Sequence, residues 1–118
     1  MPCAVLRDWF LIKDESPYML FTCPVQREKM GRIPAVTHVD GSARVQSLRR
    51  DDNPLLHELL TAFYKKTGVP ILLNTSFNRR GEPIVESPSD AYDCFIGSGI
   101  DVLILGNFLI MKTTYEGI

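Results

Sequence analysis

The fold depends on one stretch, NPLLHELLTAFYKKTGVPILLNTS, which runs from Asn53 to Ser76. Its first part carries the signals of a helix. Asn53 can cap the first free amides, Pro54 suits the first helical position, and the leucines and Phe63 recur at helical spacing. Gly68 can adopt the left-handed conformation that ends many helices. The pattern therefore predicts a helix between Asn53 and Gly68.

The second part of this stretch is a short apolar run, Val69 to Leu73, which follows the helix stop directly. A polar segment, Asn74-Thr75-Ser76, closes it. Short apolar runs between turn residues are typical of fully buried strands. We therefore expect the helix to lead into a central strand.

Towards the C-terminus, Ser87-Pro88-Ser89-Asp90 reads as a helix cap with a first-turn proline and an acidic partner. It predicts a second helix from Pro88 to about Ile96. Two strand patterns, Asp101 to Leu105 and Phe108 to Lys112, flank Gly106-Asn107 and predict a closing hairpin.

Towards the N-terminus, Tyr18 to Val25 predicts a strand, and Gln26 to Arg32 predicts a surface loop. Ala35 to Val39 and Ala43 to Leu48 flank the turn signal Asp-Gly-Ser, which favours a β-hairpin. The first fifteen residues are the least readable part of the sequence. Together these elements predict an α/β (α+β) fold, with helices packed on a sheet, as a single domain over residues 1–118.

The composition restricts the function. The chain has 118 residues, 13 Lys and Arg against 14 Asp and Glu, and a net charge of −1, which offers no general attraction to nucleic acid or to an anionic membrane. No apolar stretch approaches the roughly 20 residues of a membrane-spanning helix. The three cysteines show no pairing or zinc-ligand spacing, so we expect a reduced, cytoplasmic protein without a metal site.

Candidate ligand-binding residues lie in the polar segment after the predicted central strand, at Asn74, Ser76, Asn78 and Arg79. Open α/β sheets place ligands at the carboxyl ends of their strands. Amides, hydroxyls and a guanidinium group suit a phosphate or a carboxylate. The alternative is an ordinary turn, because Asn, Ser and Gly favour turns for backbone reasons.

Arg44 is a further candidate, because it lies in a strand pattern on the face opposite Val45. It is either solvent-facing or directed toward the same ligand as the polar segment. His38 and Asp40 share one strand face and could form a carboxylate-oriented imidazole, or they are a surface His and a turn Asp. His38 and His57 have no clustered partners that would define a metal site.

Several longer motifs occur in a fixed order. They are SPYML at 16–20, IPAVTHVDGSARVQ at 33–46, GVPILLNTSFN at 68–78, GEPIV at 81–85 and DVLILG at 101–106. From about Ser16 to Ile110 the chain resembles the C-terminal domain of the O-carbamoyltransferases, a family that includes nodulation-factor and antibiotic-tailoring enzymes.

The resemblance implies a YrdC-like domain with a twisted mixed sheet around a positively charged cavity. Such a domain binds carbamoyl phosphate and ATP, with Mg²⁺ as a companion of ATP, and forms carbamoyl-adenylate. By position in the motifs, Arg44 would contact the phosphate or nucleotide, and Asn74 and Ser76 would line the pocket. Asn78 and Arg79 lie in the same loop, and the resemblance implies that they belong to the site without indicating which group each of them contacts.

The resemblance also implies a partner. In the family a separate N-terminal domain, similar to actin-like sugar kinases and carrying an iron-type metal site, transfers the carbamoyl group to a hydroxyl acceptor. Nothing in this chain corresponds to that domain, and the chain begins after an Arg- and Gly-rich stretch that normally opens the C-terminal domain. We therefore expect a partial transferase domain that is incomplete or inactive alone. The alternative is a non-catalytic interaction module that pairs with a partner chain.

Overall fold

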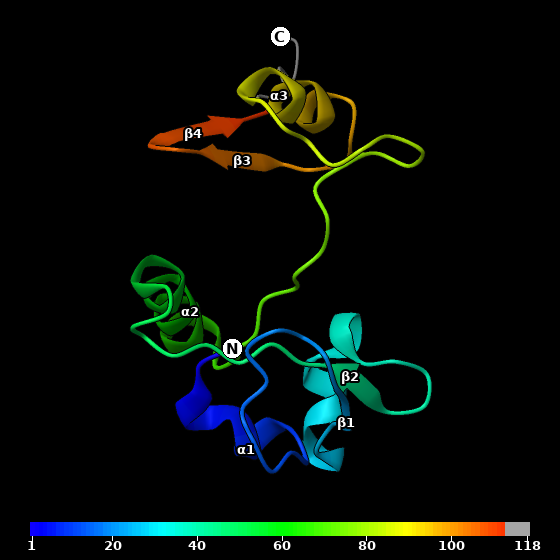
Figure 1. The fold of residues 1–118 in the computed structure, drawn as a ribbon, viewed down its shortest axis with the longest axis vertical. Helices are drawn as coiled ribbons and strands as arrows, with labels where there is room; N and C mark the ends of the chain where they lie inside the picture. Colours follow the sequence, from blue (N-terminus) through cyan, green and yellow to red (C-terminus); the bar gives the residue numbers. More distant parts are fainter. Residues whose placement is uncertain (113–118) are drawn as a thin grey trace, which may run out of the picture. The chain divides into compact units, whose positions relative to one another are not determined.

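The computed structural model describes residues 1–112, which divide into two compact units (Figure 1). The first unit is Met1–Leu73, and the second begins at Asn74. Each unit has its own hydrophobic core. The prediction of one domain over residues 1–118 stays a prediction, and the units are described separately below.

The first unit opens with two short helical segments, η1 (Cys3–Val5) and α1 (Leu6–Trp9). Leu6, Trp9 and Phe10 are almost completely buried. The core around them also contains Met1, Cys23, Val25, Ile33, Ala43 and Val45. The N-terminal segment, which is the least readable part of the sequence, therefore supplies the largest side chains of this core.

The sheet of the first unit has two antiparallel strands, β1 (Thr22–Pro24) and β2 (Ser42–Arg44), with Cys23 opposite Ala43. Of the predicted strand Tyr18 to Val25, residues 22–24 form β1, and Val25 forms a separate antiparallel bridge with Phe10. The segment between β1 and β2 contains two 3₁₀ helices, η2 (Arg27–Arg32) and η3 (Pro34–Val36). The sequence had predicted a surface loop over Gln26–Arg32 and a strand over Ala35–Val39.

The predicted hairpin of Ala35–Val39 with Ala43–Leu48 is wrong, although its turn is present. The amide of His38 donates to the carbonyl of Ser42 at 2.7 Å, and Gly41 has φ +80°. Pro34 begins a 3₁₀ helix that uses part of the first predicted strand. β2 then pairs with β1, a partner that is distant in sequence.

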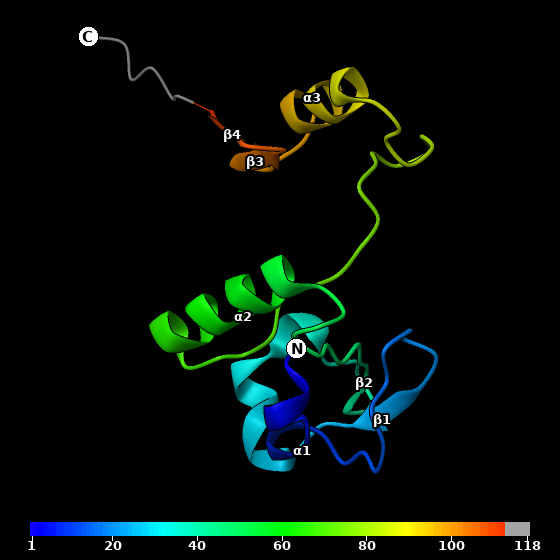
Figure 2. The same ribbon diagram turned by 60° about the vertical axis from the view of Figure 1, so that its left-hand side comes forward.

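The predicted helix between Asn53 and Gly68 is confirmed as α2 (Pro54–Thr67), which extends along one side of the first unit (Figure 2). The Asn53 side chain accepts a hydrogen bond from the Leu56 amide at 3.1 Å. Gly68 ends the helix with φ +72°. Of its leucines only Leu60 is buried, and Leu55 is 79% exposed.

The predicted strand Val69–Leu73 is wrong, because this segment has no regular secondary structure. Pro70 is buried and Ile71 packs against the core of the first unit, whereas Leu73 is exposed. A proline has no N–H for a strand ladder, and no strand in residues 1–112 pairs with the segment.

The second unit contains α3 (Pro88–Ile96), β3 (Val102–Leu105) and β4 (Phe108–Met111), which confirm the predicted helix and closing hairpin. The Ser87 hydroxyl caps α3 by accepting from the Asp90 amide at 3.1 Å. Phe95 is completely buried against Ala91 and Leu103. The α+β class is thus confirmed. The described strands form two separate antiparallel pairs instead of the one mixed sheet expected.

Candidate functional site

Two of the sequence motifs are joined by hydrogen bonds in the first unit. The amide of Ser16 donates to the hydroxyl of Ser47 at 2.7 Å, and the amide of Ser47 donates to the carbonyl of Ser16 at 2.8 Å. The Ser16 hydroxyl donates to the Val45 carbonyl at 2.9 Å, and the Gln46 amide group donates to the Pro17 carbonyl at 3.0 Å. The SPYML segment is therefore fixed against the end of the ARVQ segment.

Arg44 lies at the end of β2, opposite Thr22 in the register. Its neighbours Ala43 and Val45 are buried, and the side chain of Arg44 is exposed on the other face of the strand. Within residues 1–112, its guanidinium takes part in no described hydrogen bond or ion pair. A firmly anchored backbone thus presents a permanently charged group that has all five donors available.

In the turn before β2, Ser42 lies between His38 and Asp40, the two residues that the sequence offered as a proton-transfer pair. The Ser42 hydroxyl and amide both donate to Asp40 Oδ1, at 2.6 and 3.0 Å, and the hydroxyl lies 3.2 Å from His38 Nδ1. These bonds, with a smaller contribution from the charge of His38, hold the pKa of Asp40 below its ordinary value. Asp40 therefore stabilises the turn, and no direct hydrogen bond to His38 is described.

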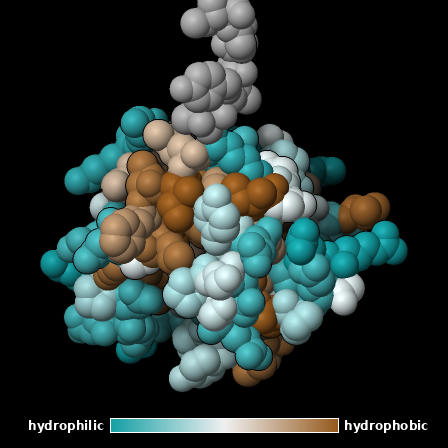
Figure 3. Space-filling model, turned by 90° about the horizontal axis from the view of Figure 1, so that it is seen from above, coloured by the Kyte–Doolittle hydropathy of each residue, from teal (hydrophilic) through white to brown (hydrophobic). Residues whose placement is uncertain are grey.

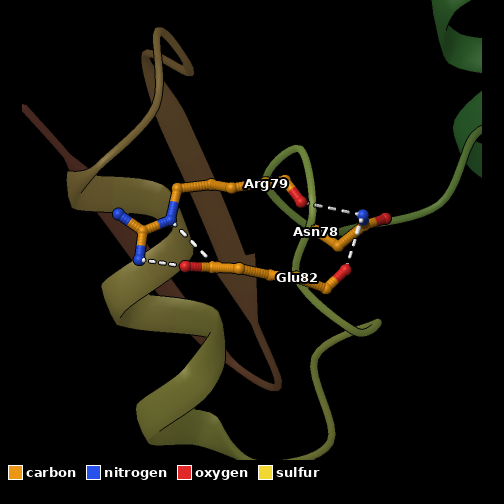
Figure 4. A network of polar contacts seen from close by, with 3 residues as sticks. All are labelled: Asn78, Arg79 and Glu82. Carbon is orange, nitrogen blue, oxygen red and sulfur yellow. Dashed lines mark hydrogen bonds and ion pairs between the residues drawn. The ribbon is translucent and has the colours of Figure 1, made fainter.

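In the second unit, residues 77–85 form a closed loop. The amide of Val85 donates to the carbonyl of Phe77 at 3.0 Å, and the amide of Glu82 donates to the carbonyl of Arg79 at 3.0 Å. Gly81 permits the tight tip because its φ is +81°. The side chain of Asn78 donates to the carbonyls of Arg79 and Glu82, at 3.0 and 3.1 Å (Figure 4). The loop is thus held by its own polar groups.

Arg79 donates two parallel hydrogen bonds to the carboxylate of Glu82, from Nε to Oε2 at 3.0 Å and from Nη2 to Oε1 at 2.9 Å (Figure 4). This ion pair raises the pKa of Arg79 above its ordinary value. The guanidinium also lies over Gly97, at the end of α3, where any Cβ would collide with it. Arg79 therefore already holds an oxyanion in the two-point geometry that arginine uses for phosphates and carboxylates.

The remaining predicted residues, Asn74 and Ser76, are exposed in the segment before this loop. The structure brings Asn78 and Arg79 into one hydrogen-bonded network, whereas Arg44 belongs to the first unit. Sequence reasoning missed Glu82 as the partner of Arg79. The spacing Arg-Arg-Gly-Glu indicates such a pair, because a tight turn brings the first and fourth residues together.

Residues 1–112 contain neither a candidate metal site nor a candidate membrane-spanning helix. No group of three or more His, Cys, Asp or Glu side chains is arranged to hold a metal ion. No helix in the same residues has the length and apolar character needed to cross a bilayer.

Comparison with known proteins identifies the family. Residues 3–112 match the model of the carbamoyltransferase C-terminus, so the chain belongs to this family. The nodulation protein NolNO of Sinorhizobium fredii is 49% identical over 102 residues, which are 86% of this chain and 15% of that protein. The nodulation protein NolO of Bradyrhizobium diazoefficiens is 47% identical, over 83% of this chain and 18% of that protein.

A third relative is named as a carbamoyltransferase. The 3'-hydroxymethylcephem-O-carbamoyltransferase of Amycolatopsis lactamdurans is 46% identical over 93 residues, which are 79% of this chain and 18% of that enzyme. The chain thus spans less than a fifth of the length of these three relatives. The expected resemblance to the C-terminal region of the carbamoyltransferases is confirmed.

Proposed function

We propose that the chain is part of a carbamoyltransferase domain that binds carbamoyl phosphate and ATP, with Mg²⁺ accompanying ATP, and forms carbamoyl-adenylate for transfer to a hydroxyl acceptor. The observation that carries the proposal is Arg44, whose exposed guanidinium lies at a fixed point of β2 within a motif of the matched family. The proposal includes a cytoplasmic location, where the three free cysteines stay reduced.

The chemistry explains why a cation at a fixed point matters. Carbamoyl phosphate, ATP and one water give carbamoyl-adenylate, phosphate and pyrophosphate, so negative charge develops on phosphoryl oxygens throughout. Positioned cations and hydrogen-bond donors lower the energy of such transition states. In this proposal Arg44 binds a phosphoryl group, and Asn74 and Ser76 donate hydrogen bonds to the carbamoyl and adenylate groups.

Asn78 and Arg79 have a supporting part in this proposal. Both described donor bonds of the Asn78 amide group go to carbonyls of its own loop, so Asn78 sets the loop conformation and retains only its acceptor oxygen for a ligand. Arg79 adds positive charge to the loop but shares it with Glu82. We therefore expect Arg79 to contact a phosphoryl group through Nη1, or after the Glu82 carboxylate moves away.

The test is a thermal-shift and calorimetric titration of the folded chain with carbamoyl phosphate, with ATP and Mg²⁺, and with both. A ligand that binds only the native state stabilises it by about 2.7 kcal/mol at one hundred times its dissociation constant. We expect Arg44→Ala and Ser76→Ala to remove the part of this stabilisation that exceeds the shift caused by the same concentration of inorganic phosphate. Arg50→Ala is the matched control, since Arg50 is also exposed and lies outside the proposed site.

Two outcomes would reject the proposal. One is a well-folded sample that shows neither heat nor a thermal shift with either ligand at millimolar concentration. The other is an equal loss in Arg44→Ala and Arg50→Ala, which would indicate general charge screening. Binding without turnover would agree with the proposal, because we propose that the transfer domain of the family, on this or another polypeptide, completes the catalyst.

A second candidate function, an interaction module, is favoured by the outer face of the β3–β4 hairpin. Val102 lies opposite Met111 and Ile104 opposite Leu109, so these four side chains share one face, and all of them are exposed. Leu103, Leu105 and Ile110 on the other face pack against α3 and Phe95. Exposed hydrophobic side chains gather in patches on the molecular surface (Figure 3).

A sheet that is apolar on both faces is typical of a strand pair covered on both sides. The partner we propose is the N-terminal transfer region of a carbamoyltransferase, because the relatives carry more than four fifths of their length outside the matched part. Analytical ultracentrifugation of the chain with the remainder of the NolNO relative should show a complex that Ile104→Lys abolishes. Val39→Lys, at another exposed β-branched residue, should leave it intact. Absence of a complex with the unsubstituted chain would reject this candidate.

A further inference from the structure

The first unit contains a hollow of about 460 Å³ that has no part in the proposed function. Side chains from α1, η2 and the end of α2 line it, among them Arg7, Asp8, Trp9, Glu28, Lys29 and Arg32. Its volume falls in the range of small-molecule sites, roughly 300 to 1,000 Å³. None of the residues proposed to bind carbamoyl phosphate or ATP lines it.

Two cations of this hollow are held in place by one aromatic ring. Trp9 is 2% exposed, so its position is fixed by the core. Lys29 Nζ lies 4.9 Å from the centroid of a Trp9 ring, and Arg32 Cζ lies 5.2 Å from it. Both distances are within the range of cation–π attraction. Arg32 is fixed a second time, because its Nη2 donates to the Gly68 carbonyl at 3.0 Å.

The charges at the hollow are not neutralised by direct contacts. Three cations and two carboxylates line it, and in residues 1–112 none of these five groups takes part in an ion pair, since the described pairs are Arg49 with Glu15 and Arg79 with Glu82. The ammonium group of Lys29 donates no described hydrogen bond in the same residues. Lys29 therefore has three donors, and Arg32 several, that point to no protein acceptor.

We propose that this hollow binds a phosphate group, free or in a small phosphate ester, between Lys29 and Arg32, with Arg7 contributing further positive charge. A phosphate dianion in the hollow would accept hydrogen bonds from donors that have no described acceptor in the protein. Hydrogen bonds between charged groups are also stronger than those to neutral acceptors such as water. Asp8 and Glu28 disfavour ligands with more charge than one phosphate group, because they repel additional anions.

The single tryptophan of the chain makes the test specific, because Trp9 forms part of the hollow and is the sole source of tryptophan emission. Inorganic phosphate and glycerol 3-phosphate are titrated separately at constant ionic strength, and each should change the emission in a saturable way. Tighter binding of one of them identifies the source of the phosphate group. Lys29→Gln should weaken binding at least tenfold by calorimetry, which does not depend on the emission of the variant.

Arg27→Gln is the matched control, because Arg27 lies on the same 3₁₀ helix but does not line the hollow, and it should bind like the unsubstituted chain. Arg44→Ala should retain the Trp9 response to phosphate even when it no longer binds carbamoyl phosphate and ATP at the site of the proposed function. The phosphate site can therefore be tested even if the proposed function is wrong. The proposal is overturned by the absence of a saturable response to both ligands, by equal losses in Lys29→Gln and Arg27→Gln, or by loss of the response in Arg44→Ala.

Discussion

Ser16 and Ser47 bond each other in both directions across 31 positions of the sequence: each amide donates to the other residue, one to a hydroxyl and one to a carbonyl. They are 1% and 2% exposed and are the buried polar residues of the described core. Because both donors are satisfied, the pair anchors the N-terminal segment to the end of β2 without leaving a buried polar group unpaired. Arg44 owes its fixed position partly to this anchor.

Replacing Ser47 with alanine should destabilise the chain by about 1 to 3 kcal/mol, because the buried amide of Ser16 then loses its acceptor. Urea unfolding followed by Trp9 emission measures the change. Ser89→Ala is the control, since Ser89 is exposed and should change the stability by less than about 0.5 kcal/mol. Equal unfolding midpoints for Ser47→Ala and the unsubstituted chain would contradict the role of the serine pair.

Phe95→Ala should cost the second unit about 3 to 5 kcal/mol, because Phe95 is completely buried and its removal leaves a cavity against Ala91 and Leu103. Hydrogen exchange of the α3 amides measures this loss within the unit. Phe108→Ala removes the same aromatic group from an exposed position and should leave α3 protection almost unchanged. A similar effect of both substitutions would mean that Phe95 is not the centre of this core.

The lowered pKa of Asp40 predicts an acid-dependent turn. A carboxyl whose pKa is depressed in the folded state contributes stability above its ordinary value of 3.8 and loses it as the pH falls through the lower, folded-state pKa. Asp40→Asn should therefore remove part of the acid sensitivity of the Ser42 amide, measured by NMR during an acid titration. Asp51→Asn, at an exposed carboxylate without a described hydrogen bond, should not. An unchanged titration of Ser42 in Asp40→Asn would refute the assignment.

Gly97→Ala should displace the Arg79 guanidinium, because the new Cβ would occupy its position. The Arg79 side chain is flexible, so we expect the ion pair with Glu82 to loosen while α3 stays folded. The readout is the NMR signal of the Arg79 Nε–H group, which should shift and exchange faster with water. Gly99→Ala is the matched control, since no atom lies within 4 Å of the position of its Cβ. An unaltered Arg79 signal in Gly97→Ala would be incompatible with the contact.

Local signals explain what could be predicted from the sequence. The caps of α2 and α3 depend on residues three positions apart, Asn53 with Leu56 and Ser87 with Asp90, and both helices lie where they were expected. The β3–β4 hairpin also needs only its own turn at Gly106. In the first unit, β2 pairs instead with β1, which lies about twenty positions earlier in the sequence. A local sequence pattern does not indicate such a distant partner.

The core and the candidate site were predicted less completely for the same reason. Leu6 and Trp9 flank two charged residues in a helix of only four residues, and the extended Phe10 follows directly, so the segment is too short to show a periodic pattern. The polar loop after Leu73 was expected, but the partner of Arg79 was not, because the ion pair with Glu82 depends on the tight turn at Gly81, which the sequence interpretation did not consider.

The division between the two units falls inside the motif GVPILLNTSFN, between Leu73 and Asn74. Dissection of the chain at this boundary would assign Gly68–Leu73 to one fragment and Asn74–Asn78 to the other. Loss of ligand binding after such a cut would not distinguish damage to the motif from the loss of any one side chain. Fragment-complementation experiments should therefore keep residues 68–78 within a single piece.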